Sequence, residues 1–173
     1  MAHLASKPAP VIDLRPATAA DDGFLFELYC QVRAPEFAML ALPEEQKAQV
    51  IRMQHSAQRA AYQAQFPGSN YEIVQQDGQA VGRIWVDRAE RDIFLVDVAL
   101  LPASCRSGIG THLIKELQSE ARATGKPIRS SVFRFNPGSL RFHEGLGFRV
   151  THEDEVEFHL EWRPAQTGET ERS

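Results

Sequence analysis

A strand, a glycine loop and a helix follow one another without interruption over residues 93–124. Residues 93–101 are apolar at almost every position, as in a strand covered on both faces, and Pro102 ends this segment. Gly108 and Gly110 then allow a tight turn and a close approach of the backbone to a ligand. Backbone N–H groups at such a helix start, together with the helix dipole, favour phosphate oxygens. The helix itself is predicted by apolar residues at helical spacing, namely Ile109, Leu113, Ile114, Leu117 and Ala121.

The loop does not match the common nucleotide-binding motifs. A nucleoside-triphosphate P-loop ends in Gly-Lys followed by Ser or Thr, whereas Gly110 is followed by Thr111 and His112. A dinucleotide fingerprint needs a third glycine where this chain has Leu113. Taken alone, the Gly-x-Gly pattern is equally compatible with an ordinary tight turn between a strand and a helix.

A second motif over residues 136–148 narrows the interpretation. It opens with Asn136, a helix-capping residue, and with Pro137 at the first helical position. Together the two segments resemble the signatures of the GNAT N-acetyltransferase superfamily, especially a bacterial branch with mostly unassigned substrates. Residues 105–110 match its loop signature, Arg/Gln-x-x-Gly-x-Gly/Ala. The signature Asn-x-x-Ala-x-x-Leu-Tyr-x-x-x-Gly-Phe is matched by Asn136, Ser139, Phe142, His143, Gly147 and Phe148.

The resemblance covers residues 11–162, and it implies an α/β fold with one mixed, mostly antiparallel sheet and helices on both faces. It also implies acetyl-CoA as co-substrate, without a metal. The pantetheine arm is expected along the strand edge at Ala99, Leu100 and Leu101, where the splayed backbone would offer an N–H to the thioester oxygen. The remainder of the CoA site is expected at Cys105, Arg106, Ser107, Gly108, Ile109, Gly110, Thr111, Asn136, Ser139 and Phe142.

Two positions depart from the family pattern. Cys105 replaces the basic or amide residue that opens the loop signature, and Arg106 follows one place later. His143 stands where many relatives have a tyrosine near the thioester sulfur. Because an unperturbed histidine titrates near about pH 6.5, His143 is a candidate general acid for the departing thiolate. The alternative is a histidine that merely packs beside pantetheine.

Asp97, Glu36 and Tyr62 are further candidates for the acceptor side of the site. Asp97 is the conspicuous polar residue of an apolar strand. It would bind the acceptor ammonium or remove its proton through water, or it would be a structural carboxylate bonded to backbone or to an arginine such as Arg83. Glu36 would bind the amine or lie in a solvated loop. One face of the second predicted helix borders the acceptor or faces solvent, and it carries His55, Arg59 and Tyr62.

Periodicity and turn residues predict the order β–αα–βββ–α–β–α–ββ. The predicted strands cover residues 11–15, 71–76, 79–86, 93–101, 128–135 and 155–162, with a further strand starting after Gly147 and a hairpin turn at Asp77-Gly78. The predicted helices run from a Thr18 cap to Val32 and over residues 43–65, 108–124 and 136–145. In the last strand we expect an inward row of Val156, Phe158, Leu160 and Trp162 and an outward row of Glu155, Glu157, His159 and Glu161.

Composition excludes several classes of protein. The 173 residues suffice for one domain, and 43% apolar and 24% charged residues fit a soluble globular protein. The net charge of −4 argues against nucleic-acid binding. No apolar run approaches the ~20 residues of a membrane span. The absence of a signal-peptide core and the two cysteines, Cys30 and Cys105, predict a cytoplasmic protein.

We therefore expect a GNAT domain over residues 11–163, between flexible tails at 1–10 and 164–173. Trp85 is predicted as a core residue or a homodimer contact. The sequence is interpreted as an N-acyltransferase that transfers acetyl from acetyl-CoA to a primary amine by direct attack in a ternary complex. The acceptor is a small molecule or a protein, and the acidic bias favours a cationic one. Two alternatives stay open: a non-catalytic acyl-CoA-binding regulatory module, and an enzyme that uses a longer acyl chain.

Overall fold

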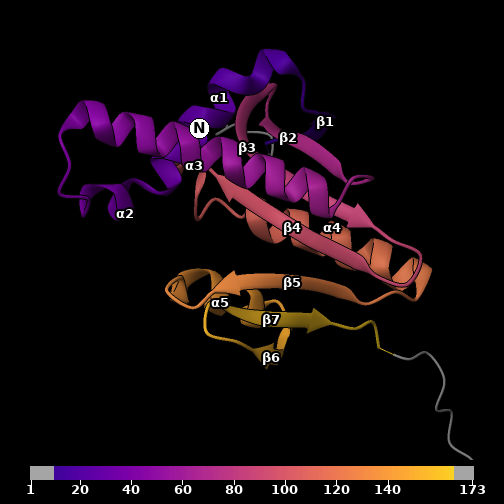
Figure 1. The fold of residues 1–173 in the computed structure, drawn as a ribbon. Coiled ribbons are helices and arrows are strands. Elements are labelled where there is room, and N and C mark those ends of the chain that lie inside the picture. Colours follow the sequence, from indigo (N-terminus) through magenta and orange to yellow (C-terminus); the bar gives the residue numbers. More distant parts are fainter. Residues whose placement is uncertain (1–9, 166–173) are drawn as a thin grey trace, which may run out of the picture.

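A seven-stranded sheet forms the centre of the protein (Figure 1). The structure is a computed structural model that describes residues 10–165, so the predicted tails lie almost entirely outside the described residues. The strands are β1 (Ile12–Pro16), β2 (Asn70–Gln76), β3 (Gln79–Arg88), β4 (Ile93–Leu100), β5 (Ile128–Phe133), β6 (Arg149–Glu153) and β7 (Glu157–Trp162). Their order in the sheet is β1-β2-β3-β4-β5-β7-β6. All neighbours are antiparallel except β4 and β5, which confirms the predicted mixed, mostly antiparallel sheet.

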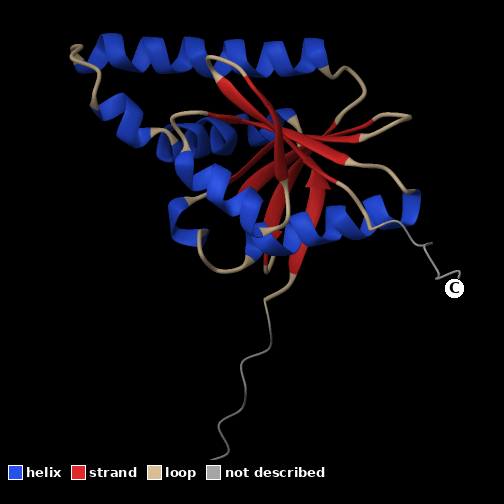
Figure 2. Ribbon diagram, turned by 90° about the horizontal axis from the view of Figure 1, so that it is seen from below, coloured by secondary structure: helices blue, strands red, loops and turns tan. Residues whose placement is uncertain are grey.

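Helices cover both faces of this sheet, as predicted. The long α3 lies on one face and α4 on the other, so that the strands run between them (Figures 1 and 2). The helices are α1 (Asp22–Val32), α2 (Ala34–Ala38), α3 (Glu44–Gln65), α4 (Ile109–Thr124) and α5 (Pro137–Gly145). No helix among residues 10–165 is long and apolar enough to cross a membrane.

The helical hairpin before β2 differs from the prediction in two places. The predicted capping box is present, but Thr18 and Asp21 cap a single 3-10 turn, η1 (Ala19–Asp21), and α1 starts at Asp22. The predicted break after α1 contains the short α2. Pro35 lies at the start of this helix, where its fixed φ and missing N–H are tolerated.

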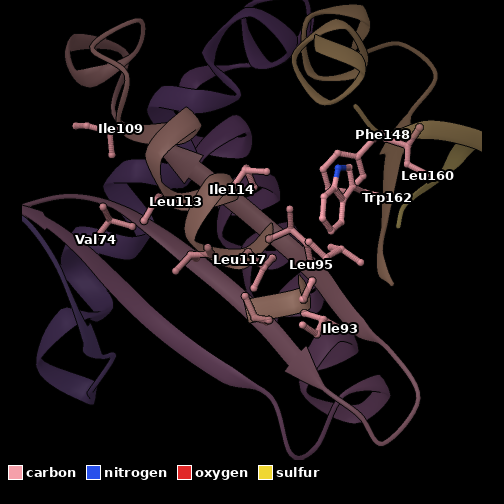
Figure 3. Packing of buried hydrophobic residues seen from close by; sticks show 14 of the residues in the cluster. Val74, Ile93, Leu95, Ile109, Leu113, Ile114, Leu117, Phe148, Leu160 and Trp162 are labelled. Atoms are coloured by element: carbon pink, nitrogen blue, oxygen red, sulfur yellow. The ribbon is translucent and has the colours of Figure 1, made fainter. Parts of the chain in front are cut away.

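The main core lies between α4 and the sheet, and Figure 3 shows its side chains pointing toward one another. Ile114, Ile93, Leu95 and Leu160 are each no more than 1% exposed. Burying a side chain of this size contributes about 1.5–3 kcal/mol. Gly125 ends α4 with a φ of 69°, as expected for a glycine after the last helical residue.

Trp85 and Val156 are two residues whose surroundings were predicted from the sequence. Trp85 is a core residue, 3% exposed, and its indole N–H donates to Ser69 Oγ at 2.5 Å. The prediction that Val156 points inward is wrong, because β7 begins only at Glu157 and Val156 is 54% exposed. Its N–H instead donates to Asp154 Oδ1 at 2.8 Å in the turn between β6 and β7.

The strands β4 and β5 separate soon after they meet. They pair over three residues, and Leu95 opposite Ser130 is the last pair. There the Ser130 hydroxyl donates to the carbonyl oxygen of Leu95 at 3.0 Å. The register of β3 and β4 also shifts at Val96, since Val86 lies opposite Leu95 and Trp85 lies opposite Asp97. Beyond this bulge the two parallel strands diverge and leave a gap in the sheet.

Candidate active site

A cavity of about 240 Å³ lies where β4 and β5 diverge. Its walls come from the α1–α3 hairpin, from the diverging parts of β4 and β5, and from the start of α5. Seven of the predicted site residues line it: Glu36, Tyr62, Asp97, Ala99, Asn136, Ser139 and His143. The predicted phosphate-binding loop, residues 105–111, does not line this cavity.

The backbone of β4 directs two N–H groups toward the gap between β4 and β5. The Leu101 N–H donates to Val81 O at 2.8 Å, so it is directed at β3. Because successive residues of a strand point their N–H groups to opposite sides, Ala99 is also directed at β3. Of the predicted edge residues, Ala99 and Leu101 therefore turn their N–H groups toward β3, whereas the N–H groups of Leu100 and of Val98 point the opposite way. These two face the side from which β5 has departed.

The loop before α4 has the backbone geometry of an anion site. Gly108 caps the helix with a φ of 86°, a left-handed conformation that favours glycine. The first turn of α4, at Ile109, Gly110 and Thr111, presents N–H groups that have no acceptor within the helix. Such a turn can hold phosphate oxygens without a charged side chain.

Gly110 lies at a close contact between two helices. A Cβ at this position would lie 3.3 Å from Phe142 Cζ and 3.8 Å from Leu100 Cδ1. The missing side chain therefore lets the first turn of α4 pack against α5. This contact joins the two sequence motifs in space.

Asp97 forms an ion pair inside the sheet. Its Oδ2 accepts from Arg83 Nε at 2.6 Å, and Arg83 is 6% exposed. Burial by itself lowers the pKa of Arg83, but the charge of Asp97, the neighbouring Tyr71 and the hydrogen bonds to both together raise the pKa above its usual range. Asp97 lines the cavity, and its charge is compensated by Arg83.

The other acceptor-side candidates occupy distinct positions. Glu36 lies in α2 and is held by Arg33, whose Nη2 is 2.5 Å from Glu36 Oε2. Tyr62 borders the cavity, and burial, aided by the negative charge of Asp97, raises the pKa of Tyr62 to about 12. Its hydroxyl therefore stays protonated and can donate a hydrogen bond.

The predicted helix face around Tyr62 divides into three environments. Arg59 forms an ion pair with Asp22 at 2.6 Å. His55 lies in the helical hairpin, where its ring packs on Phe26 and Tyr29. Tyr62 is therefore the member of this face that borders the cavity.

His143 is buried at the cavity wall. Its Nδ1 lies 2.8 Å from the carbonyl oxygen of Ser139, so this nitrogen carries the proton and donates. Burial lowers the pKa of His143, and the hydrogen bond to Ser139 opposes the shift only in part. Its Nε2 is buried and has no hydrogen-bond partner among residues 10–165. This arrangement favours a neutral imidazole with a free acceptor nitrogen over an imidazolium acid.

Two further cavity residues were not identified from the sequence. Glu157 and Ser131 both line the cavity. Glu157 was predicted to face outward, but the antiparallel pairing of β5 and β7 places it opposite Phe133, on the face that the helical hairpin covers. Within the described part of the chain, its carboxylate forms no ion pair. The alternation of residues in β7 assigned Glu157 to the correct face of the sheet. It did not show that helices cover this face.

Among the described residues, no group of three or more His, Cys, Asp or Glu side chains is arranged to hold a metal ion.

The Acetyltransferase (GNAT) family matches residues 35–148 of this chain. The chain therefore belongs to this family.

Among curated proteins, it is similar to the uncharacterised N-acetyltransferase CgeE of Bacillus subtilis (strain 168), with 30% identity over 78 residues. These residues are 45% of this chain and 30% of CgeE, so the chain spans less than a third of that relative.

Two solved structures are similar in fold. The PaiA N-acetyltransferase of Thermoplasma acidophilum, in complex with coenzyme A, has a TM-score of 0.67 at 21% identity, covering 89% of this chain and 99% of that chain. An acetyltransferase of Thermus thermophilus has a TM-score of 0.64 at 15% identity, covering 88% and 97%. At these identities the likeness shows a common fold.

Proposed function

We propose that this protein transfers acetyl from acetyl-CoA to a primary amine, which attacks the thioester directly in a ternary complex. The observation that carries the proposal is the cavity at the divergence of β4 and β5. Its β4 wall offers the unpaired N–H groups of Val98 and Leu100, and α5 supplies the unpartnered Nε2 of His143. The site therefore combines oxyanion donors with a buried polar atom suited to a ligand.

The residues present fit acetyl-CoA as co-substrate. The first turn of α4 would hold the pyrophosphate, and the free edge of β4 would bind the pantetheine amides. A backbone N–H at Val98 or Leu100 would donate to the thioester oxygen as negative charge develops there. One preorganised donor of this kind contributes on the order of 3 kcal/mol.

The CoA leaving group needs little help from a general acid. A thiol titrates near pH 8.5 if it behaves like cysteine, so CoA can depart as a thiolate close to neutral pH. A neutral His143 would accept a hydrogen bond at Nε2 and orient the ligand beside it. General-acid help from His143 is therefore not part of the proposed step.

The acceptor is proposed to carry a positive charge. Of the three carboxylates that line the cavity, Glu36 and Asp97 are paired with Arg33 and Arg83. Glu157 forms no ion pair with any residue between 10 and 165, so it is available to an ammonium group. The net charge of −4 adds a weak long-range attraction for cations. A cytoplasmic location fits this proposal, since Cys30 and Cys105 are free thiols.

The test is release of free CoA from acetyl-CoA with a panel of primary amines: a polyamine, an aminoglycoside and a lysine peptide. We expect steady release that depends on the amine, with the acetylated amine identified by mass spectrometry. Binding of acetyl-CoA by calorimetry without amine-dependent release would instead support a regulatory module. The same assay with longer acyl-CoA thioesters measures the chain-length preference.

A further inference from the structure

We propose that Ser131, His159 and Asp154 form a relay that takes the proton from the acceptor amine and passes it to solvent. The proposal rests on the transfer reaction proposed above and assigns its general base. The three side chains come from β5, from β7 and from the turn between β6 and β7. They are not adjacent in the sequence, and the register of the sheet brings them together.

Ser131 is placed at the point where the sheet divides. It directly follows Ser130, the last residue of β5 that pairs with β4, and it lines the cavity. In the antiparallel pairing of β5 and β7 it lies opposite His159. The Oγ of Ser131 is 3.1 Å from Nδ1 of His159, which is hydrogen-bonding distance.

Asp154 fixes the orientation of the imidazole. Its Oδ2 lies 2.9 Å from Nε2 of His159, and its Oδ1 accepts the backbone N–H groups of Val156 and Glu157 at 2.8 Å each. The bonds from His159 and from these two amides hold the pKa of Asp154 below its usual range. A permanent carboxylate at Nε2 leaves Nδ1 as the acceptor that faces Ser131.

The relay carries one proton from the acceptor amine to His159 and then to solvent. The ammonium proton of the acceptor passes to Ser131 Oγ while the hydroxyl proton of Ser131 passes to Nδ1 of His159. The amine nitrogen then forms the N–C bond to the acetyl carbon, the C–S bond breaks, and CoA leaves as a thiolate. The imidazolium, paired with Asp154, finally loses its proton to water and returns to the neutral state.

The exposure of His159 suits this last step. Its side chain is 37% exposed, whereas His143 is 3% exposed and has no comparable route to solvent. The cavity carboxylate Asp97 is committed to Arg83, so it is a weaker candidate for the base. Ser131 contacts the cavity, and His159 contacts water.

Several charged or titratable groups surround His159. The ring of His152 on β6 stacks on it at 5.4 Å between centroids. Arg129 and Glu161 form a neighbouring ion pair across β5 and β7, and Arg134 pairs with Glu153 beside Asp154. Glu157 lies two residues away on the same strand. Of the charged groups between residues 10 and 165, only Asp154 contacts a ring nitrogen of His159, so the test changes Asp154 and leaves the remote charges in place.

The closing experiment compares Ser131→Ala, His159→Gln and Asp154→Asn with the wild type over pH 6 to 9. The readouts are kcat/KM for the amine, the acetyl-CoA Kd by calorimetry and the melting temperature. We expect kcat/KM to fall about 100-fold at pH 7, the lower end for loss of a general base. The ratio of wild-type to variant kcat/KM should decrease toward pH 9, because a larger fraction of an amine with a pKa near 10.4 is already deprotonated by solvent at that pH. The acetyl-CoA Kd should stay unchanged.

Three variants separate proton transfer from structure. His159→Gln keeps a neutral polar side chain but cannot take a proton from Ser131, so it should lose as much activity as Ser131→Ala. His152→Gln removes the stacked imidazole outside the relay and should behave as the wild type. Added imidazole should restore part of the activity of His159→Ala, because the site is open to solvent.

The outcomes distinguish the relay from the transfer reaction on which it rests. No amine-dependent CoA release by the wild type would overturn both. Normal kcat/KM in Ser131→Ala and His159→Gln, with an active wild type, would overturn the relay alone. An acetyl group on Ser131 after incubation with acetyl-CoA without amine would also overturn it, in favour of a covalent path.

Discussion

Arg83 and Asp97 are diagonal neighbours on one face of β3 and β4, and their side chains meet at 2.6 Å between Nε and Oδ2. Arg83 is almost completely buried, and its Nη2 also approaches Gln58 of α3 at 3.4 Å. A carboxylate can lie in the apolar β4 because this arginine compensates its charge. The pair therefore links the sheet to α3 at the edge of the cavity.

Asp97→Asn is expected to act mainly on stability. The amide can still accept a hydrogen bond from Arg83, but the buried guanidinium loses its counter-charge. Breaking a buried pair from one side costs about 3–5 kcal/mol, and the remaining hydrogen bond favours the lower end. The free energy of unfolding, measured by denaturant titration, should fall accordingly. Unchanged stability with a large loss of turnover would show that Asp97 serves the amine.

Glu157→Gln should weaken binding of the amine. The substitution keeps the shape of the side chain and removes the charge that faces the cavity. A hydrogen bond to a charged partner is worth about 1.5–3 kcal/mol, so KM for a cationic amine should rise about tenfold or more with kcat little changed. Glu155→Gln is the matched control, since Glu155 is exposed and does not line the cavity. Equal KM values for the two variants would remove Glu157 from the acceptor site.

The sequence predicts those segments whose conformation depends on residues close to them in the chain. The strand, loop and helix over residues 93–124 depend on local periodicity and on the conformations of Gly108 and Gly125, and all were confirmed. The short α2 was missed because five residues give too little periodicity. The positions of Ser131 and Glu157 depend on the register between β5 and β7 and on the helices above them. Such long-range packing leaves no local pattern.

Gly108→Ala should weaken acetyl-CoA binding. No atom lies within 4 Å of the added Cβ, so the effect arises from the left-handed backbone and not from a clash. That conformation costs a residue with a Cβ about 1–2 kcal/mol, or the loop moves its N–H groups away from the ligand. The Kd measured by calorimetry should rise about tenfold. Gly108→Asn, which tolerates positive φ better, should show a smaller effect, and equal Kd values for both variants and the wild type would contradict the loop assignment.

His143→Ala should lower kcat by a similar factor at every pH from 7 to 9. The bond from Nδ1 to Ser139 and the lowered pKa keep His143 neutral in this range, so it carries no second, imidazolium proton that a rise in pH could remove. The measurement is the ratio of wild-type to variant kcat across the range. A ratio that declines toward one as the pH rises would instead show that an imidazolium protonates the thiolate.

We expect the two buried histidines, His55 and His143, to make the fold less stable below pH 6.5. Burial, followed by the charges of Arg83 and Arg59, lowers the pKa of His55 from 6.5, and burial lowers that of His143 from the same value. The unfolded chain therefore binds more protons than the folded one as the pH falls through 6.5, and the free energy of unfolding decreases. Each histidine can contribute at most about 1.4 kcal/mol per pH unit.

His55→Phe tests this pH dependence. The ring of His55 already packs on Phe26 and Tyr29 at 5.5 and 5.0 Å between centroids, and its Nε2 is buried without a partner among residues 10–165. Phenylalanine suits this site and does not titrate, so the variant should lose less stability than the wild type between pH 7.5 and 5.5. Denaturant titrations at these two pH values measure the difference, and the exposed His152→Gln should keep the wild-type slope. If His55→Phe and the wild type lose stability equally, His55 does not contribute to acid sensitivity, and the effect must come from His143 or from other groups.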